Sequence, residues 1–163
     1  MASQISSQSF TVTRVASAPR EKVWALVSTA SSWKDWAGVM RSSLEREGDP
    51  APDGVGAIRV LGPSLVGSRE QVVEWDPPAH LGYVILSGMP VKNYRADIRL
   101  EEKTTSDGSP VTTVIEWSAT FDPKVPGTGA LMRTVLRAII SRFCSRAARY
   151  AARRTGIPPH EGP

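Results

Sequence analysis

The feature that most constrains the fold is a series of short alternating segments between residues 55 and 122, each closed by a turn signal. Asn93–Glu102 places apolar and charged residues on opposite faces, and Val111–Phe121 shows the same alternation. This period of two is typical of antiparallel strands with one buried and one solvated face. Pairs such as Gly62-Pro63 and Asp76-Pro77 separate the segments. The sequence therefore predicts consecutive antiparallel strands joined by short turns.

The remaining elements lie before and after this series. Two short helices are expected after the first strand: one begins at Ser17-Ala18-Pro19, with Ser17 as its cap, and the other covers Thr29–Trp36. A long helix follows Gly127. The expected strands are Phe10–Val15, Met40–Glu47, Val55–Leu61, Ser68–Trp75, Leu81–Ser87, Asn93–Glu102 and Val111–Phe121.

The long helix has an apolar stripe that we expect to face the sheet. Its members follow helical spacing, and they are Leu131, Met132, Val135, Leu136, Ile139 and Phe143. Beyond Phe143 the same side of the helix carries arginines. This change predicts that the second half of the helix overhangs the sheet edge or meets a partner.

These elements predict an α+β fold, in which a curved antiparallel sheet of about seven strands is covered by the long C-terminal helix. A chain of 163 residues with 40% apolar residues is suited to one domain with one core. We expect that domain to span residues 8–154, with flexible termini at 1–7 and 155–163.

Composition excludes several classes of site. The single cysteine, Cys144, rules out an internal disulfide and favours a reduced, cytoplasmic setting. Two histidines, His80 and His160, are too few for a histidine-rich metal site, so we expect no metal and no cofactor. No apolar run reaches the ~20 residues of a membrane span, and residues 1–9 lack a secretory signal pattern. No phosphate-binding loop or G-x-S-x-G motif occurs.

Positive charge is concentrated near the C-terminus. Residues 126–154 contain seven arginines and no acidic residue. This segment is either a solvated helix face or a weak contact with an acidic surface or membrane through Arg142, Arg146, Arg149 and Arg153. Nucleic acid is not expected, because no strand interleaves basic and aromatic residues. The overhanging helix leaves both a monomer and a homodimer open.

Several segments together resemble the SRPBCC superfamily, which has the START-like, birch-pollen-allergen-like helix-grip fold. They are the Ala18-Pro19 and Val23-Trp24 opening, the Trp33 and Trp36 pair, Glu70–Tyr83, Gly88–Tyr94 and Thr113–Trp117. The branch most similar is the one named for polyketide cyclase/dehydrase and lipid transport, and the resemblance covers about residues 8–154.

The resemblance implies an internal, largely apolar cavity between the long helix and the sheet, which holds a small hydrophobic or amphipathic molecule. Its mouth would lie near the Trp33–Trp36 helix and the turns after Gly62 and Ser87. The candidate ligand-binding residues are Trp33, Trp36, Met40, Ile58, Arg59, Glu70, Tyr83, Ile85, Tyr94, Ile98, Ile115, Trp117, Leu131, Val135 and Ile139. No catalytic residue can be assigned, because this superfamily has no fixed catalytic motif.

Several candidates have two interpretations. Trp33 and Trp36 are either an entrance lid or anchors of a short helix. Tyr83 and Tyr94 either offer hydroxyls to a ligand or are satisfied within the protein.

Arg59 and Glu70 form either a buried ion pair at a polar end of the cavity or a surface pair. The surface interpretation is favoured, because alternation does not settle which way their strands face. His80 is expected to be solvated, and Cys144 to be an unreactive filler.

Three functions remain open at this point. The leading one is a binder or carrier of a lipid-like or polyketide-like compound. The second is a cyclase, aromatase or dehydratase that uses an inward-facing acid or base such as Glu70, Arg59, Tyr83 or Tyr94. The third is an interaction module that uses the arginine-rich helix.

Overall fold

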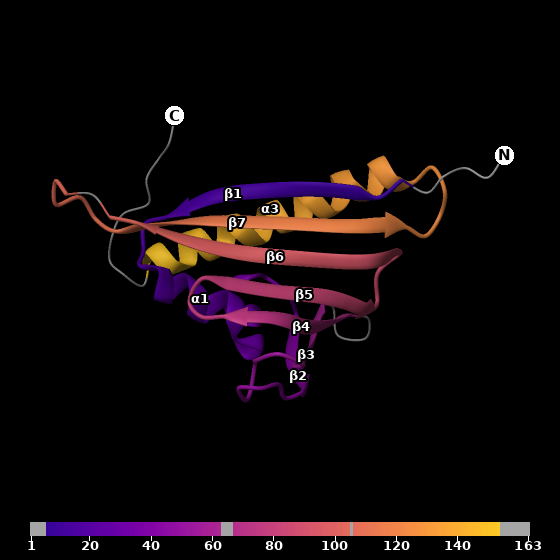
Figure 1. The fold of residues 1–163 in the computed structure, drawn as a ribbon, viewed down its shortest axis with the longest axis horizontal. Coiled ribbons are helices and arrows are strands. Elements are labelled where there is room, and N and C mark those ends of the chain that lie inside the picture. The colour runs from indigo at the N-terminus through magenta and orange to yellow at the C-terminus, as the bar shows by residue number, and fades with distance from the viewer. Residues whose placement is uncertain (1–5, 63–66, 105, 154–163) are drawn as a thin grey trace.

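The computed structural model describes residues 6–62, 67–104 and 106–153. Within these ranges the chain forms one curved antiparallel sheet of seven strands, three α-helices and one short 3-10 turn (Figure 1). The elements are β1 (Gln8–Ala16), α1 (Arg20–Ser28), η1 (Ala30–Ser32), α2 (Trp33–Trp36), β2 (Arg41–Arg46), β3 (Ile58–Gly62), β4 (Ser68–Asp76), β5 (His80–Ser87), β6 (Val91–Lys103), β7 (Thr112–Pro123) and α3 (Gly129–Arg153). The predicted α+β helix-grip fold is confirmed.

The sheet has the order β1-β7-β6-β5-β4-β3-β2, so neighbours from β2 to β7 are also consecutive in the chain. Only β1 joins the sheet out of sequence, beside β7, with Phe10 opposite Ala119. Figure 1 shows β1, β7 and β6 nearly face on, whereas β3 and β2 turn away beneath them. The sheet is therefore strongly curved, and α3 crosses the face behind β1, β7 and β6.

Alternation in the two longest strands explains which face is buried. On β6 the residues Tyr94, Ala96, Ile98 and Leu100 are buried, and Arg99 between them is exposed. The small side chains of Ala96 and Ala119 lie opposite each other on β6 and β7. Strand β3 behaves differently, because four consecutive residues from Ile58 to Leu61 are buried. Burial does not alternate along β3, because both faces of this strand are shielded from solvent.

The start of α1 corrects one prediction. The capping position is Pro19 rather than Ser17, and the side chain at that position makes no capping hydrogen bond. Instead the carboxylate of Glu102, on β6, accepts a 2.9 Å hydrogen bond from the backbone N–H of Arg20. The free amide is satisfied by a residue 82 positions away, which no local capping pattern can reveal.

Helix α3 corrects a second prediction. Leu131, Val135 and Ile139 were expected to face the sheet, but they are 61%, 41% and 43% exposed. The buried residues of the helix are Gly129, Leu136, Ile140, Cys144, Ala147, Ala148, Ala151 and Ala152. The second half of α3 therefore does not overhang the sheet.

The physical reason is residue size. Alanine side chains are small, so the second half of α3 can lie close to α1. Hydropathy patterns give more weight to large side chains, and therefore they do not mark this side of the helix as buried. Figure 1 shows the end of α3 beside α1 and its beginning at the β1 edge. On the first half, Leu136 and Ile140 are buried, whereas Leu131, Val135 and Ile139 are left largely in solvent.

An aromatic cluster joins the short helices to the sheet and α3. Trp33 contacts Trp117 of β7 and Phe143 of α3, edge to face, with ring centroids 5.8 and 5.6 Å apart. Large aromatic rings in such geometry contribute strongly to a core. The cluster therefore fixes α2 between the sheet and the long helix.

The predicted flexible termini, residues 1–7 and 155–163, lie outside the described residues except for residues 6 and 7. Among the described helices, none combines the length and the apolar character needed to cross a membrane.

Cys144 generates a prediction about reactivity. Its side chain is fully buried, and burial raises the pKa of the thiol to about 12. Because the thiolate is the reactive form, we expect the folded protein to react with iodoacetamide at pH 8 at least ~100-fold more slowly than a free thiol. Mass spectrometry of the alkylated protein measures this, and urea-unfolded protein should react completely. Rapid labelling of the folded protein would contradict the buried position.

Candidate functional site

A pocket of about 320 Å³ lies between α3 and the sheet. This volume is at the lower end of the range of small-molecule sites, ~300–1,000 Å³. Residues from β3, β4, β5, β6, α2 and α3, together with the turn after β5, surround it. The lining residues are Trp33, Val39, Leu61, Gly62, Gly67, Ser68, Glu70, Tyr83, Ile85, Gly88, Met89, Tyr94, Leu136, Ile139, Ile140 and Phe143.

Most of the pocket wall is apolar. Helix α3 contributes Leu136, Ile139, Ile140 and Phe143, whose spacing of three and four residues places them on one side of the helix. The indole of Trp33 forms another part of the wall. Such a surface favours an apolar ligand through burial rather than through directed bonds.

The polar groups of the pocket gather around Glu70. This side chain comes from β4 and is only 6% exposed. Its Oε1 accepts a 3.2 Å hydrogen bond from the hydroxyl of Ser68, and its Oε2 accepts one of 3.2 Å from Arg59. The pocket thus combines apolar walls with one polar end, an arrangement that orients an amphipathic molecule.

Arg59 lies opposite Glu70, on the neighbouring strand β3, and is fully buried. Its guanidinium lies over two aromatic rings, 5.4 Å from the centroid of Trp33 and 5.3 Å from that of Tyr83. Its Nη1 donates a 3.1 Å hydrogen bond to the carbonyl of Val27. Its Nε has no hydrogen-bond partner among the described residues. Ring faces and the Glu70 carboxylate therefore compensate a positive charge that is removed from water.

Burial determines the protonation behaviour of Glu70. Loss of hydration raises the pKa of its carboxyl, and attraction to Arg59 offsets part of that rise. The carboxyl therefore takes up a proton at a higher pH than an exposed glutamate does. A carboxyl with a raised pKa in a pocket is suited to hydrogen bonding or to proton transfer.

Two phenols lie next to this carboxyl. The hydroxyl of Tyr83 accepts a 3.2 Å hydrogen bond from the indole N–H of Trp117. Burial raises the pKa of Tyr83 and of Tyr94, and hydrogen bonding with Tyr83 offsets part of the rise at Tyr94. Both phenols therefore remain protonated and can offer polar hydrogens inside the pocket.

The structure places the fifteen predicted site residues in three groups, and whether any of them contacts a ligand stays a prediction. Six line the pocket: Trp33, Glu70, Tyr83, Ile85, Tyr94 and Ile139. Six are buried in the core without lining it: Trp36, Ile58, Arg59, Ile98, Ile115 and Trp117. Three are exposed and lie outside the lining: Met40, Leu131 and Val135.

The favoured surface interpretation of Arg59 and Glu70 is wrong. The two residues are directly opposite on β3 and β4, and both are buried. Because four consecutive residues of β3 are buried, its sequence carries no alternation that could indicate the inward face. The buried ion pair was the alternative interpretation of the sequence.

The two tryptophans of α2 are anchored in the protein. The indole N–H of Trp33 donates to the carbonyl of Val27, and that of Trp36 donates to the carbonyl of Leu26, both at 3.2 Å. Both rings are nearly fully buried. They are therefore fixed anchors of a short helix, and Trp33 also forms part of the pocket wall.

Sequence reasoning missed several lining residues, among them Ser68, Met89 and Ile140. The turn around Gly88 held one usable signal. Gly88 has a φ of +94°, and a Cβ there would lie 2.3 Å from the carbonyl oxygen of Gly67. Glycine thus lets the turn after β5 approach the beginning of β4. The resemblance implied a cavity mouth near the turn after Ser87, and Gly88 and Met89 of that turn do line the pocket.

His80 lies away from the pocket. Its Nε2 is 2.7 Å from the carboxylate of Asp97, which also accepts a 3.0 Å hydrogen bond from Arg95. Burial tends to raise the pKa of Asp97, but the bonds from Arg95 and His80 outweigh it and lower that pKa. Asp97 follows the buried Ala96 on β6, so this polar cluster belongs to the outer face of the sheet.

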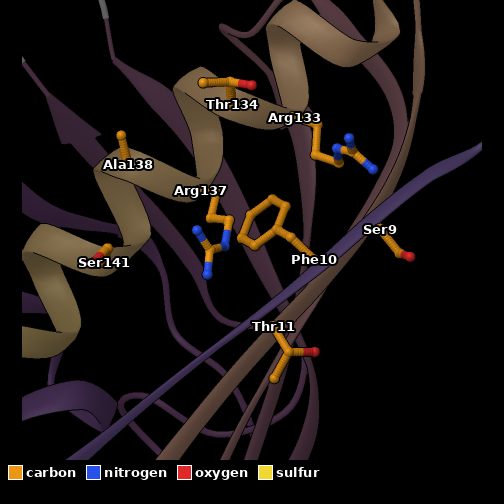
Figure 2. A pocket seen from close by; sticks show the side chains of 8 residues that line it. All are labelled: Ser9, Phe10, Thr11, Arg133, Thr134, Arg137, Ala138 and Ser141. Carbon is orange, nitrogen blue, oxygen red and sulfur yellow. The ribbon is translucent and has the colours of Figure 1, made fainter.

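A second hollow of about 570 Å³ lies between β1 and the first half of α3 (Figure 2). Figure 2 shows Arg133 and Arg137 extending from α3 toward β1, with the ring of Phe10 between the two elements. Both arginines and most of the other lining residues are exposed. This surface groove encloses a ligand less well than the apolar pocket, which is therefore the better candidate site.

Among the described residues, no three His, Cys, Asp or Glu side chains gather where they could hold a metal ion.

Comparison with known proteins identifies the family. Residues 7–152 match the family described as polyketide cyclase/dehydrase and lipid transport. The chain therefore belongs to this family, which lies within the SRPBCC superfamily that the sequence resembles. No curated protein matches the chain in sequence.

Solved structures agree with this fold. The protein XoxI from Bacillus cereus is 23% identical with a TM-score of 0.69, over 87% of this chain and 94% of that one. Norcoclaurine synthase from Thalictrum flavum, in complex with dopamine and hydroxybenzaldehyde, is 14% identical with a TM-score of 0.65, over 97% and 90% of the two chains. The TM-scores show a shared fold, and identities this low show the fold alone.

The buried pair generates a stability prediction. Arg59→Met leaves the Glu70 carboxylate buried without its partner, and we expect a loss of about 3–5 kcal/mol in the free energy of unfolding at pH 7. Adding Glu70→Gln removes the unpaired charge and should restore more than half of that loss. Urea denaturation of the two variants and the wild type measures both values.

The pH dependence of Arg59→Met carries a definite sign. Burial already raises the pKa of Glu70 above its ordinary value of 4.5 in the wild type, and loss of the attraction to Arg59 should raise it further. The ionisation penalty is therefore absent below pH 4.5 and grows as the pH rises through the folded pKa. The destabilisation relative to wild type should shrink as the pH falls. A loss that is constant with pH, or a double variant no more stable than the single one, would contradict the buried pair.

Proposed function

We propose that the protein binds a small hydrophobic or amphipathic molecule, lipid-like or polyketide-like, in the pocket between α3 and the sheet. The observation that carries the proposal is the pocket of about 320 Å³ with apolar walls and the polar group of Ser68, Glu70 and Tyr94 at one end. Family membership supports the same class of ligand. The limited volume favours a compact molecule over a lipid with two long chains.

The polar end indicates how the ligand is oriented. Glu70 offers a carboxylate oxygen as an acceptor, and Tyr94 keeps its phenolic proton. A ligand with a hydroxyl or carbonyl group could bond here while its apolar part contacts Ile139, Ile140 and Phe143. Norcoclaurine synthase, which shares the fold, is known in complex with two compounds of this compact kind.

The setting proposed for this function is the cytoplasm, with the protein as a monomer or a homodimer. The single cysteine, buried at Cys144, supports a reducing compartment.

A pocket-filling substitution tests the proposal. Ile85 lines the pocket, whereas the next residue, Leu86, does not and is 43% exposed. Ile85→Trp should occupy the space and weaken binding of the uncharged fluorescent probe Nile red at least ~10-fold. Leu86→Trp adds the same group on the other side of β5 and should leave the affinity unchanged. Fluorescence titration of purified protein measures both.

Two outcomes of the titration would contradict the proposal. One is a wild-type protein that does not bind the probe. The other is equal affinity in wild type and Ile85→Trp, with Ile85→Trp shown to be folded by circular dichroism.

A second candidate function is favoured by the raised pKa of Glu70 inside the pocket. A polyketide-like substrate carries acidic C–H bonds between carbonyl groups. Glu70 could remove such a proton while Tyr94 donates a hydrogen bond to the carbonyl oxygen that gains negative charge. This proton transfer is the step that a cyclase or aromatase would need first.

Proton exchange tests this second candidate. In D₂O the wild-type protein should accelerate deuterium incorporation between the carbonyls of a β-diketone, as followed by NMR. Glu70→Gln should reduce the acceleration by ~10²-fold or more, because it removes the base, while Nile red binding is kept. An exchange rate equal to that of buffer alone would exclude the acid–base role and leave the binding function intact.

A further inference from the structure

The outward side of α3 is divided into an apolar and a basic half. Leu131, Val135 and Ile139 are exposed on the first half, and Arg142, Arg149 and Arg153 are exposed on the second. Successive members of this set are separated by three, four or seven residues, so all six lie along one side of the helix. We call these six residues the outer face of α3.

The apolar half is a substantial surface. Its three residues are 61%, 41% and 43% exposed, and they occupy three consecutive turns. A contiguous exposed apolar patch on a folded protein marks a contact site. The protein itself leaves these three side chains exposed, so only an external partner could bury them.

The basic half lacks internal compensation. None of the ion pairs formed within residues 6–62, 67–104 and 106–153 involves Arg142, Arg149 or Arg153. Helix α3 itself contains no acidic residue between Gly129 and Arg153. The charge of this half is therefore available to an external anion, and the long arginine stems add apolar surface.

The outer face adjoins the ligand pocket. Ile139 belongs to the exposed row and also lines the pocket. A partner that covers Leu131, Val135 and Ile139 therefore lies next to the pocket wall.

We propose that the outer face of α3 docks on an anionic lipid bilayer. The side chains of Leu131, Val135 and Ile139 enter the boundary between headgroups and acyl chains, and the arginines contact lipid phosphates. Where the pocket binds an apolar ligand, as proposed above, docking brings it to the surface from which such a ligand is taken or to which it is returned.

Charge distinguishes a bilayer from a second copy of this chain. Two outer faces brought together would place arginines against arginines or against apolar residues, with no acidic residue on either face. An anionic bilayer satisfies both halves at once, because it offers negative headgroups above an apolar interior.

Vesicle co-sedimentation tests the proposal. The full chain should bind vesicles of phosphatidylcholine that contain about one third phosphatidylserine, and should bind pure phosphatidylcholine much more weakly. Salt near ~1 M should release much of the bound protein, because it screens the arginines. Equal binding to the two vesicle types, or no binding to either, would overturn the proposal.

Charge variants show whether the outer face is responsible. Arg142→Gln/Arg149→Gln/Arg153→Gln should weaken binding to the anionic vesicles at least ~10-fold. Lys22→Gln/Lys92→Gln/Arg99→Gln removes the same net charge from exposed positions outside α3 and should retain most of the affinity. Equal loss in the two variants would mean that net charge alone drives binding, and would overturn the assignment to α3.

Apolar variants complete the test. Leu131→Ser/Val135→Ser should weaken vesicle binding, whereas Val15→Ser/Val55→Ser alters two other exposed residues and should not. None of these residues lines the pocket, so Nile red binding measured without vesicles should stay unchanged in every variant. Loss of docking with intact probe binding thus separates this proposal from the proposed ligand binding.

Discussion

The buried guanidinium of Arg59 is the interaction on which the site depends. It joins β3 to the end of α1 through the carbonyl of Val27 and to β4 through Glu70. The rings of Trp33 and Tyr83 lie against it. A charge this deep is tolerated only when it is paired and bonded. One side chain therefore fixes the short helices against the sheet and holds Glu70 at the polar end of the pocket.

Helix α3 serves two surfaces with different residue types. Its alanines allow close packing in the second half, and its larger residues Leu136, Ile140 and Phe143 form the pocket wall. Leu131 and Val135 are exposed on the first half of the helix, which lies at the β1 edge. The same helix thus closes the core, lines the proposed ligand pocket and carries the surface proposed to dock on a bilayer.

The alternating strands and the meander order could be predicted from the sequence, because period-two burial on β6 and β7 is a local property. The helix-grip fold followed from the resemblance to the SRPBCC superfamily. The facing of Arg59 and Glu70 could not, since β3 is buried on both sides. The buried side of α3 was misjudged because alanine contributes little to hydropathy but permits close approach. The cap supplied by Glu102 is a tertiary contact, and capping patterns register only neighbours in sequence.

Native mass spectrometry of freshly purified protein tests the central claim most directly. The account predicts a fraction of molecules carrying one small hydrophobic compound that organic solvent releases and that Ile85→Trp loses. Identification of the released compound would define the ligand class. A bare protein mass under all conditions, together with a crystal structure in which side chains fill the space between α3 and Glu70, would contradict a ligand-binding pocket.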